Sequence, residues 1–255
     1  SEDFTFTPDD GDATYVVTLT VTDSDTPANI GQDAATVSVS NVAPSVSADN
    51  ASVTVDEGQL AANSGTLSDP GADTVTLTAS VGTVIDNGNG TWSWSYATTD
   101  GPEDTQAVTI TATDSDGAHT DATFSLTVSN VAPAPQITGL PGGPWPELSP
   151  IALSVDANDP GSADTFTYSW TVAKDGVPYA SGTDREFSFV PDGPGAFEVA
   201  VTVTDDDGGV GLDSEAVTVT AVTFRVTDFT ANPSGFDVTF IRPADMSGVN
   251  LYGGF

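Results

Sequence analysis

Aspartate pairs at a regular spacing are the residues of this sequence best suited to chemistry. An Asp-x-Asp turn begins at Asp23, Asp114 and Asp205, and successive copies lie 91 residues apart. A second acidic turn, which opens with Asp-Pro-Gly, begins at Asp69 and again at Asp159. Carboxylates held close together repel one another unless a cation lies among them, and calcium prefers a flexible shell of oxygen ligands. The two kinds of turn therefore predict a calcium site in each complete repeat.

The predicted ligands come from both turns of a repeat. In an immunoglobulin-like sandwich, the loop between the second and third strands and the loop between the last two strands lie at the same end. The linker from the preceding domain also reaches that end, so Asn41 and Asn130 are candidates for additional carbonyl ligands, and calcium is expected to stiffen the joint. We expect a Kd on the order of 0.1 to 1 mM. The expected carboxylate ligands are Asp69, Asp73, Asp114 and Asp116 in one repeat and Asp159, Asp164, Asp205 and Asp207 in the next.

A second interpretation explains the same residues without a metal. Asp and Gly are ordinary turn formers, and the chain holds 37 acidic residues against 4 Lys plus Arg. Acidity on this scale can simply keep the surface solvated, as in proteins from salty environments. The two interpretations differ in one measurable respect, because only a metal site responds to calcium beyond its response to salt.

The acidic turns are flanked by stretches with the period of a β-strand. Residues 106–113 and 124–128 alternate apolar and polar side chains on the two sides of one turn. This alternation is typical of strands with one buried face, and two such strands joined by an Asp/Gly turn form a hairpin. The complete unit spans 106–133 and recurs at 15–44 and 197–221. A repeat of this length is too long for a solenoid and close to the roughly 100 residues of an immunoglobulin-like sandwich.

The composition favours an all-β chain and excludes several functions. Val and Thr are abundant, Gly and Pro recur at short intervals, and no helical period is found. No Lys or Arg precedes Lys174, so nucleic acid is excluded as a partner and an anionic membrane is disfavoured. No apolar run approaches the roughly 18 residues of a membrane span, so no membrane insertion is expected within this sequence. The sequence has no cysteine, which excludes disulfides and thiol chemistry.

The third repeat resembles a known family. Its characteristic stretches are Asp159-Pro160-Gly161, Tyr168-Ser169-Trp170, Pro191-Asp192-Gly193-Pro194-Gly195 and the run VTVTDDDGG at 201–209. They are similar to those of the PKD (polycystic kidney disease) family of β-sandwiches. The resemblance extends over about residues 1–222, although Gln106 stands where the other copies have Tyr15 and Phe197. It implies non-catalytic modules of large secreted or cell-surface prokaryotic proteins, such as adhesins, S-layer proteins and multi-domain hydrolases. Residues 235–245 look like the opening of a bacterial immunoglobulin-like domain.

The predicted fold is all-β, a linear array of tandem immunoglobulin-like (PKD-like) β-sandwiches. Because the sequence begins inside a repeat, we expect a piece of a longer protein. Its first part is expected either to be loosely ordered or to have its open edges covered by another chain or a neighbouring domain. The four predicted parts are 1–44, the C-terminal half of a PKD-like domain; 45–133 and 134–222, two complete PKD-like sandwiches; and 223–255, the incomplete start of a different immunoglobulin-like domain.

Individual strands are expected both in the first part and in the third repeat. In the first part a strand is expected at Phe4–Thr7. Those of the third repeat are expected at Ile151–Val155, Thr165–Val172, Phe187–Val190, Phe197–Thr204 and Ala216–Thr220.

Three tryptophans are candidates for binding a ligand. Trp92 and Trp94 alternate along one predicted strand and could form an aromatic platform for a sugar. The favoured interpretation places them in the core, because the intervening Thr and Ser side chains are the natural outward residues. Trp145, in a proline-rich connector, is the better candidate for exposure, and packing over the joint is its alternative.

These observations favour a non-catalytic role. His119 has no nucleophile motif beside it, and the carboxylates recur once per repeat, as structural features do. The leading hypothesis is a calcium-stiffened spacer or adhesive segment of a large extracellular surface protein. Its partners would be neighbouring domains, adjacent copies in a filament or surface layer, and a glycan or cell-surface ligand. The alternative is a set of polymer- or carbohydrate-binding accessory modules of a secreted hydrolase.

Overall fold

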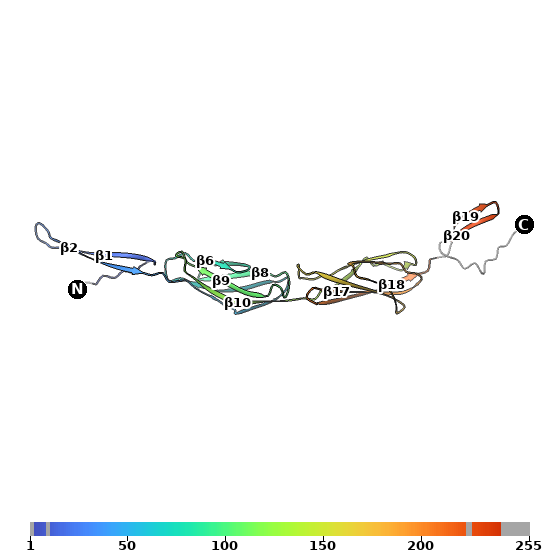
Figure 1. Cartoon of the computed structure of the whole chain (residues 1–255), viewed down its shortest axis with the longest axis horizontal. Coiled ribbons are helices and arrows are strands. Elements are labelled where there is room, and N and C mark those ends of the chain that lie inside the picture. The colour runs from blue at the N-terminus through green and yellow to red at the C-terminus, as the bar shows by residue number, and fades with distance from the viewer. Residues whose placement is uncertain (1–2, 9–10, 223–225, 241–255) are drawn as a thin grey trace. The chain divides into compact units, whose positions relative to one another are not determined.

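The computed structural model describes residues 3–8, 11–222 and 226–240 (Figure 1). Within these ranges every regular element is a β-strand, so the predicted all-β class is confirmed. The described part of the chain contains no helix that could cross a membrane.

The chain divides into two compact units that do not follow the sequence order strictly. The first unit comprises Ser1–Pro133, Asn158–Phe166 and Thr204–Val210, and the second comprises Ala134–Ala157, Thr167–Val203 and Gly211–Phe255. The two short segments of the first unit carry the Asp-Pro-Gly turn and the Asp-x-Asp turn of the third repeat. Both acidic turns of that repeat therefore belong to the same compact unit as residues 1–133.

The first complete sandwich consists of two four-stranded sheets. All of its strand pairs are antiparallel except one, in which β4 (Ser52–Asp56) runs parallel to the last strand, β10 (His119–Ser129). The first sheet has the order β3 (Ser45–Ala48), β5 (Leu60–Ser68), β8 (Thr91–Ala97) and β7 (Thr83–Asp86). The second sheet has the order β4 (Ser52–Asp56), β10 (His119–Ser129), β9 (Gln106–Thr113) and β6 (Thr76–Ala79).

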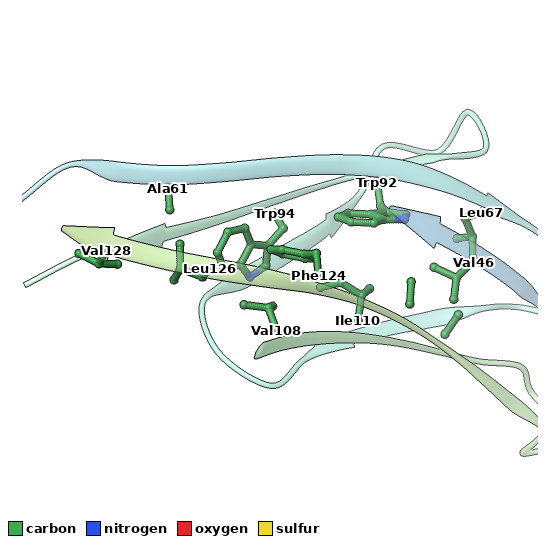
Figure 2. Packing of buried hydrophobic residues seen from close by; sticks show 12 residues of the cluster. Val46, Ala61, Leu67, Trp92, Trp94, Val108, Ile110, Phe124, Leu126 and Val128 are labelled. Carbon is green, nitrogen blue, oxygen red and sulfur yellow. The ribbon is translucent and has the colours of Figure 1, made fainter. Parts of the chain in front are cut away.

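The core of this sandwich lies between the two sheets and is built around two tryptophans. Trp92 and Trp94 on β8 are 0% and 2% exposed, and Figure 2 shows Trp94 next to Phe124 from the opposite sheet. The Trp94 and Phe124 rings meet edge to face with centroids 5.0 Å apart, an arrangement that adds about 0.5–1.5 kcal/mol beyond burial. Each indole N–H donates to a backbone carbonyl, from Trp92 to Ser47 and from Trp94 to Val81. The outward positions of β8 are Thr and Ser, as the alternation predicted.

The second complete sandwich also has eight strands, but they divide into one sheet of three and one of five. Its parallel pair is β12 (Trp145–Pro146) with β18 (Val210–Thr220), which is equivalent to β4 with β10. The strand β15 (Val177–Gly182), which forms a hairpin with β14 (Phe166–Lys174), was not expected from the sequence. One sheet has the order β11 (Gln136–Thr138), β13 (Ile151–Asp156) and β16 (Glu186–Phe189). The other has the order β12 (Trp145–Pro146), β18 (Val210–Thr220), β17 (Gly195–Asp205), β14 (Phe166–Lys174) and β15 (Val177–Gly182).

A two-stranded hairpin lies in sequence on each side of the sandwiches. The first pairs β1 (Ala13–Thr22) with β2 (Ile30–Val39), and the second pairs β19 (Val226–Asn232) with β20 (Gly235–Phe240). The strand expected at Phe4–Thr7 does not form. Four residues with apolar alternation are evidently too short a signal without a neighbouring strand to bond.

Candidate metal centre

The first carboxylate group lies at one end of the first complete sandwich. The β5–β6 connection supplies Asp69 and Asp73, the β9–β10 turn supplies Asp114, and one carboxylate oxygen from each lies within 4.8 Å of the other two. Local bonds fix both loops: Asp69 Oδ1 accepts the N–H of Gly71 at 2.8 Å, and Asp114 Oδ1 accepts that of Ala118 at 2.8 Å. The structure thus brings together three of the four carboxylates predicted for this repeat.

Asn41 joins this group from the segment before the sandwich. Its side-chain amide N–H donates to Asp114 Oδ2 at 2.8 Å, and this bond is the main cause that lowers the pKa of Asp114. Asp114 is only 5% exposed, so the amide compensates part of the cost of burying a charge. The prediction placed a carbonyl oxygen of Asn41 among the ligands, whereas the bond seen here uses its nitrogen.

Asp116 does not join the group. Its side chain is exposed and belongs to none of the carboxylate groups in the described residues. The expectation that Asp116 lies with Asp69, Asp73 and Asp114 is therefore wrong. The reason is local: the turn buries its first aspartate under the backbone amides of the hairpin and directs the third residue to solvent.

The second carboxylate group consists of Asp159, Asp164 and Asp205, whose oxygens again lie within 4.8 Å of one another. Asp205 is 5% exposed and accepts the N–H of Gly209 at 2.7 Å. Its second oxygen accepts the amide N–H of Asn130 at 3.2 Å. The arrangement repeats that of Asp114 and Asn41, and all of these residues lie in the first compact unit.

A third group was not predicted from the sequence. It contains Glu57, Asp100, Asp164 and Asp207, with one oxygen of each within 4.8 Å of the others. Asp207 was expected beside Asp159 and Asp205 and lies instead in this group, which also shares Asp164. Glu57 follows β4 and Asp100 follows β8, so neither belongs to the two acidic turns that attract attention in the sequence.

Glu57 is held rigidly by backbone amides. It is 1% exposed, its Oε2 accepts the N–H of Gly101 at 2.9 Å, and its Oε1 accepts that of Val131 at 2.7 Å. Gly101 packs so closely on the chain that a Cβ there would lie 2.8 Å from the carbonyl carbon of Ser129. The recurrence of a glutamate in the next repeat, Glu147, could have identified Glu57. Glu147 is also buried, and it accepts the N–H of Val222 in the same way.

The loop that carries Asp100 is tied both to its own sandwich and to residues 158–166. Asp104 Oδ2 accepts the N–H of Thr99 at 2.7 Å and that of Asp100 at 3.3 Å. The carbonyl of Thr99 accepts the N–H of Ala163 at 3.1 Å. These bonds place Asp100 beside the Asp-Pro-Gly turn of the following repeat within the first unit.

Several oxygens in these groups are buried and accept no hydrogen bond. A buried acceptor without a partner costs about 1–3 kcal/mol, and more when it is charged. Such atoms point to a ligand, and the donor set of carboxylate and amide oxygens is that of a calcium site. They are Asp69 Oδ2, Asp73 Oδ2, Asp100 Oδ1, Asp159 Oδ2, both oxygens of Asp164, Asp207 Oδ2 and Asn130 Oδ1.

The electrostatics of the groups indicate the same need for positive charge. Burial, followed by the nearby Asp159 and Glu57, raises the pKa of Asp164 to about 7. Burial and repulsion by Glu103 and Asp100 raise the pKa of Asp207 to about 6. The first unit contains no Lys or Arg in its sequence segments. No Lys or Arg of this unit can therefore balance the carboxylates.

The candidate ligand-binding aromatics lie mostly in the core. Trp92 and Trp94 are buried, so the platform interpretation is wrong for both. Trp145 is half-buried on β12 and donates its indole N–H to the carbonyl of Ser149 at 3.2 Å. His119 is exposed at the start of β10.

Comparison with known proteins identifies an immunoglobulin-like domain in the middle of the chain. The family described as Bacterial Ig domain matches residues 41–127, which include the strands of the first complete sandwich up to most of β10. Together with the two sandwiches, this match confirms tandem immunoglobulin-like β-sandwiches. The likeness to the PKD family stays a prediction. A search of curated proteins found no match.

Several solved multi-domain structures match the chain at low sequence identity. The fibronectin(III)-like modules of Clostridium thermocellum CbhA are 18% identical, with 70% of this chain and 94% of that chain covered and a TM-score of 0.30. Titin domains z1z2, in complex with telethonin, are 14% identical, covering 72% and 100% with a TM-score of 0.38. The Yersinia pseudotuberculosis adhesin InvE is 14% identical, covering 69% and 58% with a TM-score of 0.30. At these TM-scores the matches bear on neither the partners nor the activity of this chain.

Proposed function

We propose that this chain is a non-catalytic structural segment of an extracellular or cell-surface protein, in which calcium stiffens tandem immunoglobulin-like domains. The fold alone does not define the function, but the carboxylate groups recur from one sandwich to the next, as structural features do. Neighbouring domains of the same chain are the first partners of such a segment, and adjacent copies in a filament or surface layer are the next.

The buried carboxylate oxygens without hydrogen-bond partners carry the proposal. An acidic surface that only keeps the protein solvated would expose its charges to water, because an exposed carboxylate is hydrated at no cost. Here Asp69, Asp73 and Asp159 each keep one oxygen buried and without a donor. Calcium accepts six to eight oxygens in flexible geometry, so it suits ligands from two loops and a preceding linker.

The same groups explain how calcium would stiffen the chain. Asn41 precedes the first sandwich and bonds to Asp114, and Asn130 follows β10 and bonds to Asp205. A cation among the carboxylates would hold these loops at one separation, and its removal would leave them to repel one another. Calcium would therefore restrict the segments next to residues 41 and 130.

The alternative role, as carbohydrate-binding modules of a secreted hydrolase, loses its main support. Two of its three candidate aromatics, Trp92 and Trp94, are buried. Trp145 alone remains as a candidate aromatic for that role.

Thermal unfolding of the full 255-residue chain tests the proposal. It is measured in about 5 mM calcium, in sodium chloride of the same ionic strength, and in chelator. Binding to the folded state alone at several times the expected Kd stabilises by about 1 to 2 kcal/mol per site. The unfolding temperature is expected to rise with calcium well beyond its rise with salt.

Two variants make the test specific. Asp73→Asn together with Asp159→Asn is expected to remove most of the calcium effect, because each removes a carboxylate from one group. Asp116→Asn is the matched control, since Asp116 lies in the same acidic turn but outside the groups. An equal rise of the unfolding temperature in salt and in calcium would reject the metal proposal and leave a plain acidic spacer.

A further inference from the structure

The geometry points to a two-cation centre in the first compact unit, in which Asp164 bridges the ions. We infer this from two carboxylate groups that meet at one residue. Asp159 and Asp205 belong only to the first group, Glu57, Asp100 and Asp207 belong only to the second, and Asp164 belongs to both. The inference rests on the proposed function and adds a site that the acidic turns alone do not define.

The dimensions of each group match one cation. Calcium binds oxygen at about 2.3–2.6 Å, so ligands on opposite sides of one ion lie at most about 5 Å apart. The contributing oxygens of each group lie within 4.8 Å of one another. Since the groups share only Asp164, they define two positions side by side.

Asp164 has the features of a bridging ligand. Both of its carboxylate oxygens are fully buried, and neither accepts a hydrogen bond. The backbone at Gly161 lies close against this carboxylate, because a Cβ there would collide with both oxygens. A carboxylate with two buried, unpartnered oxygens can offer one donor atom to each cation.

Further oxygens without partners lie on both sides of Asp164. Asp159 Oδ2 is buried and unpartnered in the first group, as are Asp100 Oδ1 and Asp207 Oδ2 in the second. Asn130 donates its amide N–H to Asp205, and its own carbonyl oxygen is buried without a partner. Each position therefore has at least one orphaned oxygen besides the shared carboxylate.

The charge balance favours two divalent cations over one. The two groups together hold six carboxylates, and the segments of this unit contain no Lys or Arg. One calcium ion would leave a net charge of about −4 among partly buried groups, and two would leave about −2. The second ion also relieves the repulsion of Asp100 and Asp207 that the first ion does not reach.

The second position would connect parts of the chain that the acidic turns do not connect. Glu57 and Asp100 lie in the first complete sandwich, while Asp164 and Asp207 lie in segments 158–166 and 204–210 of the same compact unit. A Cβ on Gly58 would lie 2.5 Å from the carbonyl oxygen of Pro160, so the backbones are already in close contact there. A cation at this position would hold that contact closed.

Counting bound calcium in the full chain tests the inference. Equilibrium dialysis at pH 8 against about 5 mM calcium, above the weak extracellular range, gives the number of ions per chain for wild type and variants. Asp100→Asn and Asp159→Asn are each expected to lose one ion relative to wild type, and Asp164→Asn is expected to lose two. Asp116→Asn is the control and is expected to lose none. Far-ultraviolet circular dichroism verifies that each variant is folded.

The outcomes separate this inference from the proposed function. Loss of a single ion in Asp164→Asn, with none lost in Asp100→Asn, would overturn the two-cation centre and leave one calcium per sandwich. A wild-type chain that binds no calcium would overturn both. If Asp164→Asn fails to fold, the pair Asp100→Asn and Asp159→Asn decides, because loss of one ion in each and of two in the double variant requires two positions.

Discussion

Replacement of Asp164 by Asn should have opposite effects with and without calcium. Without a cation, the wild-type carboxylate is a buried charge among other carboxylates, which raises its pKa from 3.8 to about 7. Because the folded-state pKa exceeds the unfolded one, the folded state is most favoured below about pH 4 and loses that advantage as the pH rises to about 7. At pH 8 in chelator the wild type carries the full penalty, and Asp164→Asn does not.

The size of this penalty follows from the pKa. Each pKa unit corresponds to about 1.4 kcal/mol, so a rise from 3.8 to about 7 corresponds to at most about 4 kcal/mol at pH 8. Partial exposure of the loop and screening by salt reduce this penalty. We expect Asp164→Asn to increase the free energy of unfolding in chelator by on the order of 2 kcal/mol. For a domain of this size, that is a rise of roughly 10 °C in unfolding temperature. In calcium the sign reverses, because the variant loses about 1 to 2 kcal/mol for each ion it no longer binds.

The assay is thermal unfolding at pH 5 and pH 8, in chelator and in calcium, for wild type, Asp164→Asn and Asp116→Asn. The difference between wild type and Asp164→Asn in chelator should shrink at pH 5, where the wild-type carboxyl is protonated in the folded state. Asp116→Asn should follow the wild type throughout. The reasoning fails if Asp164→Asn is less stable than wild type in chelator at pH 8, or if calcium stabilises it as much as the wild type.

Three further predictions concern the scaffold around the site. Trp94→Ala should lower the free energy of unfolding in urea by about 3–5 kcal/mol, because it leaves a cavity between the sheets. A decrease below about 1 kcal/mol would contradict the placement of Trp94 in the core. Gly101→Ala should cost about 1–3 kcal/mol through its clash with the backbone, whereas Gly142→Ala, whose Cβ meets nothing within 4 Å, should be nearly neutral. Asn41→Ala should raise the pKa of Asp114 by removing the bond that lowers it. Carboxyl-carbon NMR titration measures this change, and an unchanged pKa would show that Asn41 does not hold Asp114 in solution.

The strands that could be predicted are those whose signal is local. On β9 and β10 the apolar side chains alternate with polar ones, and the same positions are buried in the structure. The strand β15 was missed because VPYASG contains a proline and has no regular alternation, and its side chains are at most half-buried. Its pairing with β14 depends on the hairpin at Asp175 and Gly176, both of which have positive φ. The pattern of apolar and polar residues in this segment therefore could not predict β15.

The residues of the candidate site also divide into those that could be predicted from the sequence and those that could not. Asp69, Asp73 and Asp114 could be grouped in advance because immunoglobulin-like topology brings their two loops to one end. Asp116 follows the same motif, yet the turn directs it to solvent. Glu57 and Asp100 belong to no motif and are grouped with Asp164 only by packing.

The sequence by itself determined the all-β class, the repeat and which side chains carry the negative charge. These depend on side-chain chemistry and on periods of two and 91 residues, which are properties of the chain in order. Only the tertiary structure decided which carboxylates lose contact with water and which of them meet. Burial and proximity arise from segments far apart in sequence, such as residues 57, 100 and 164, and the free energy of a buried charge depends on those neighbours.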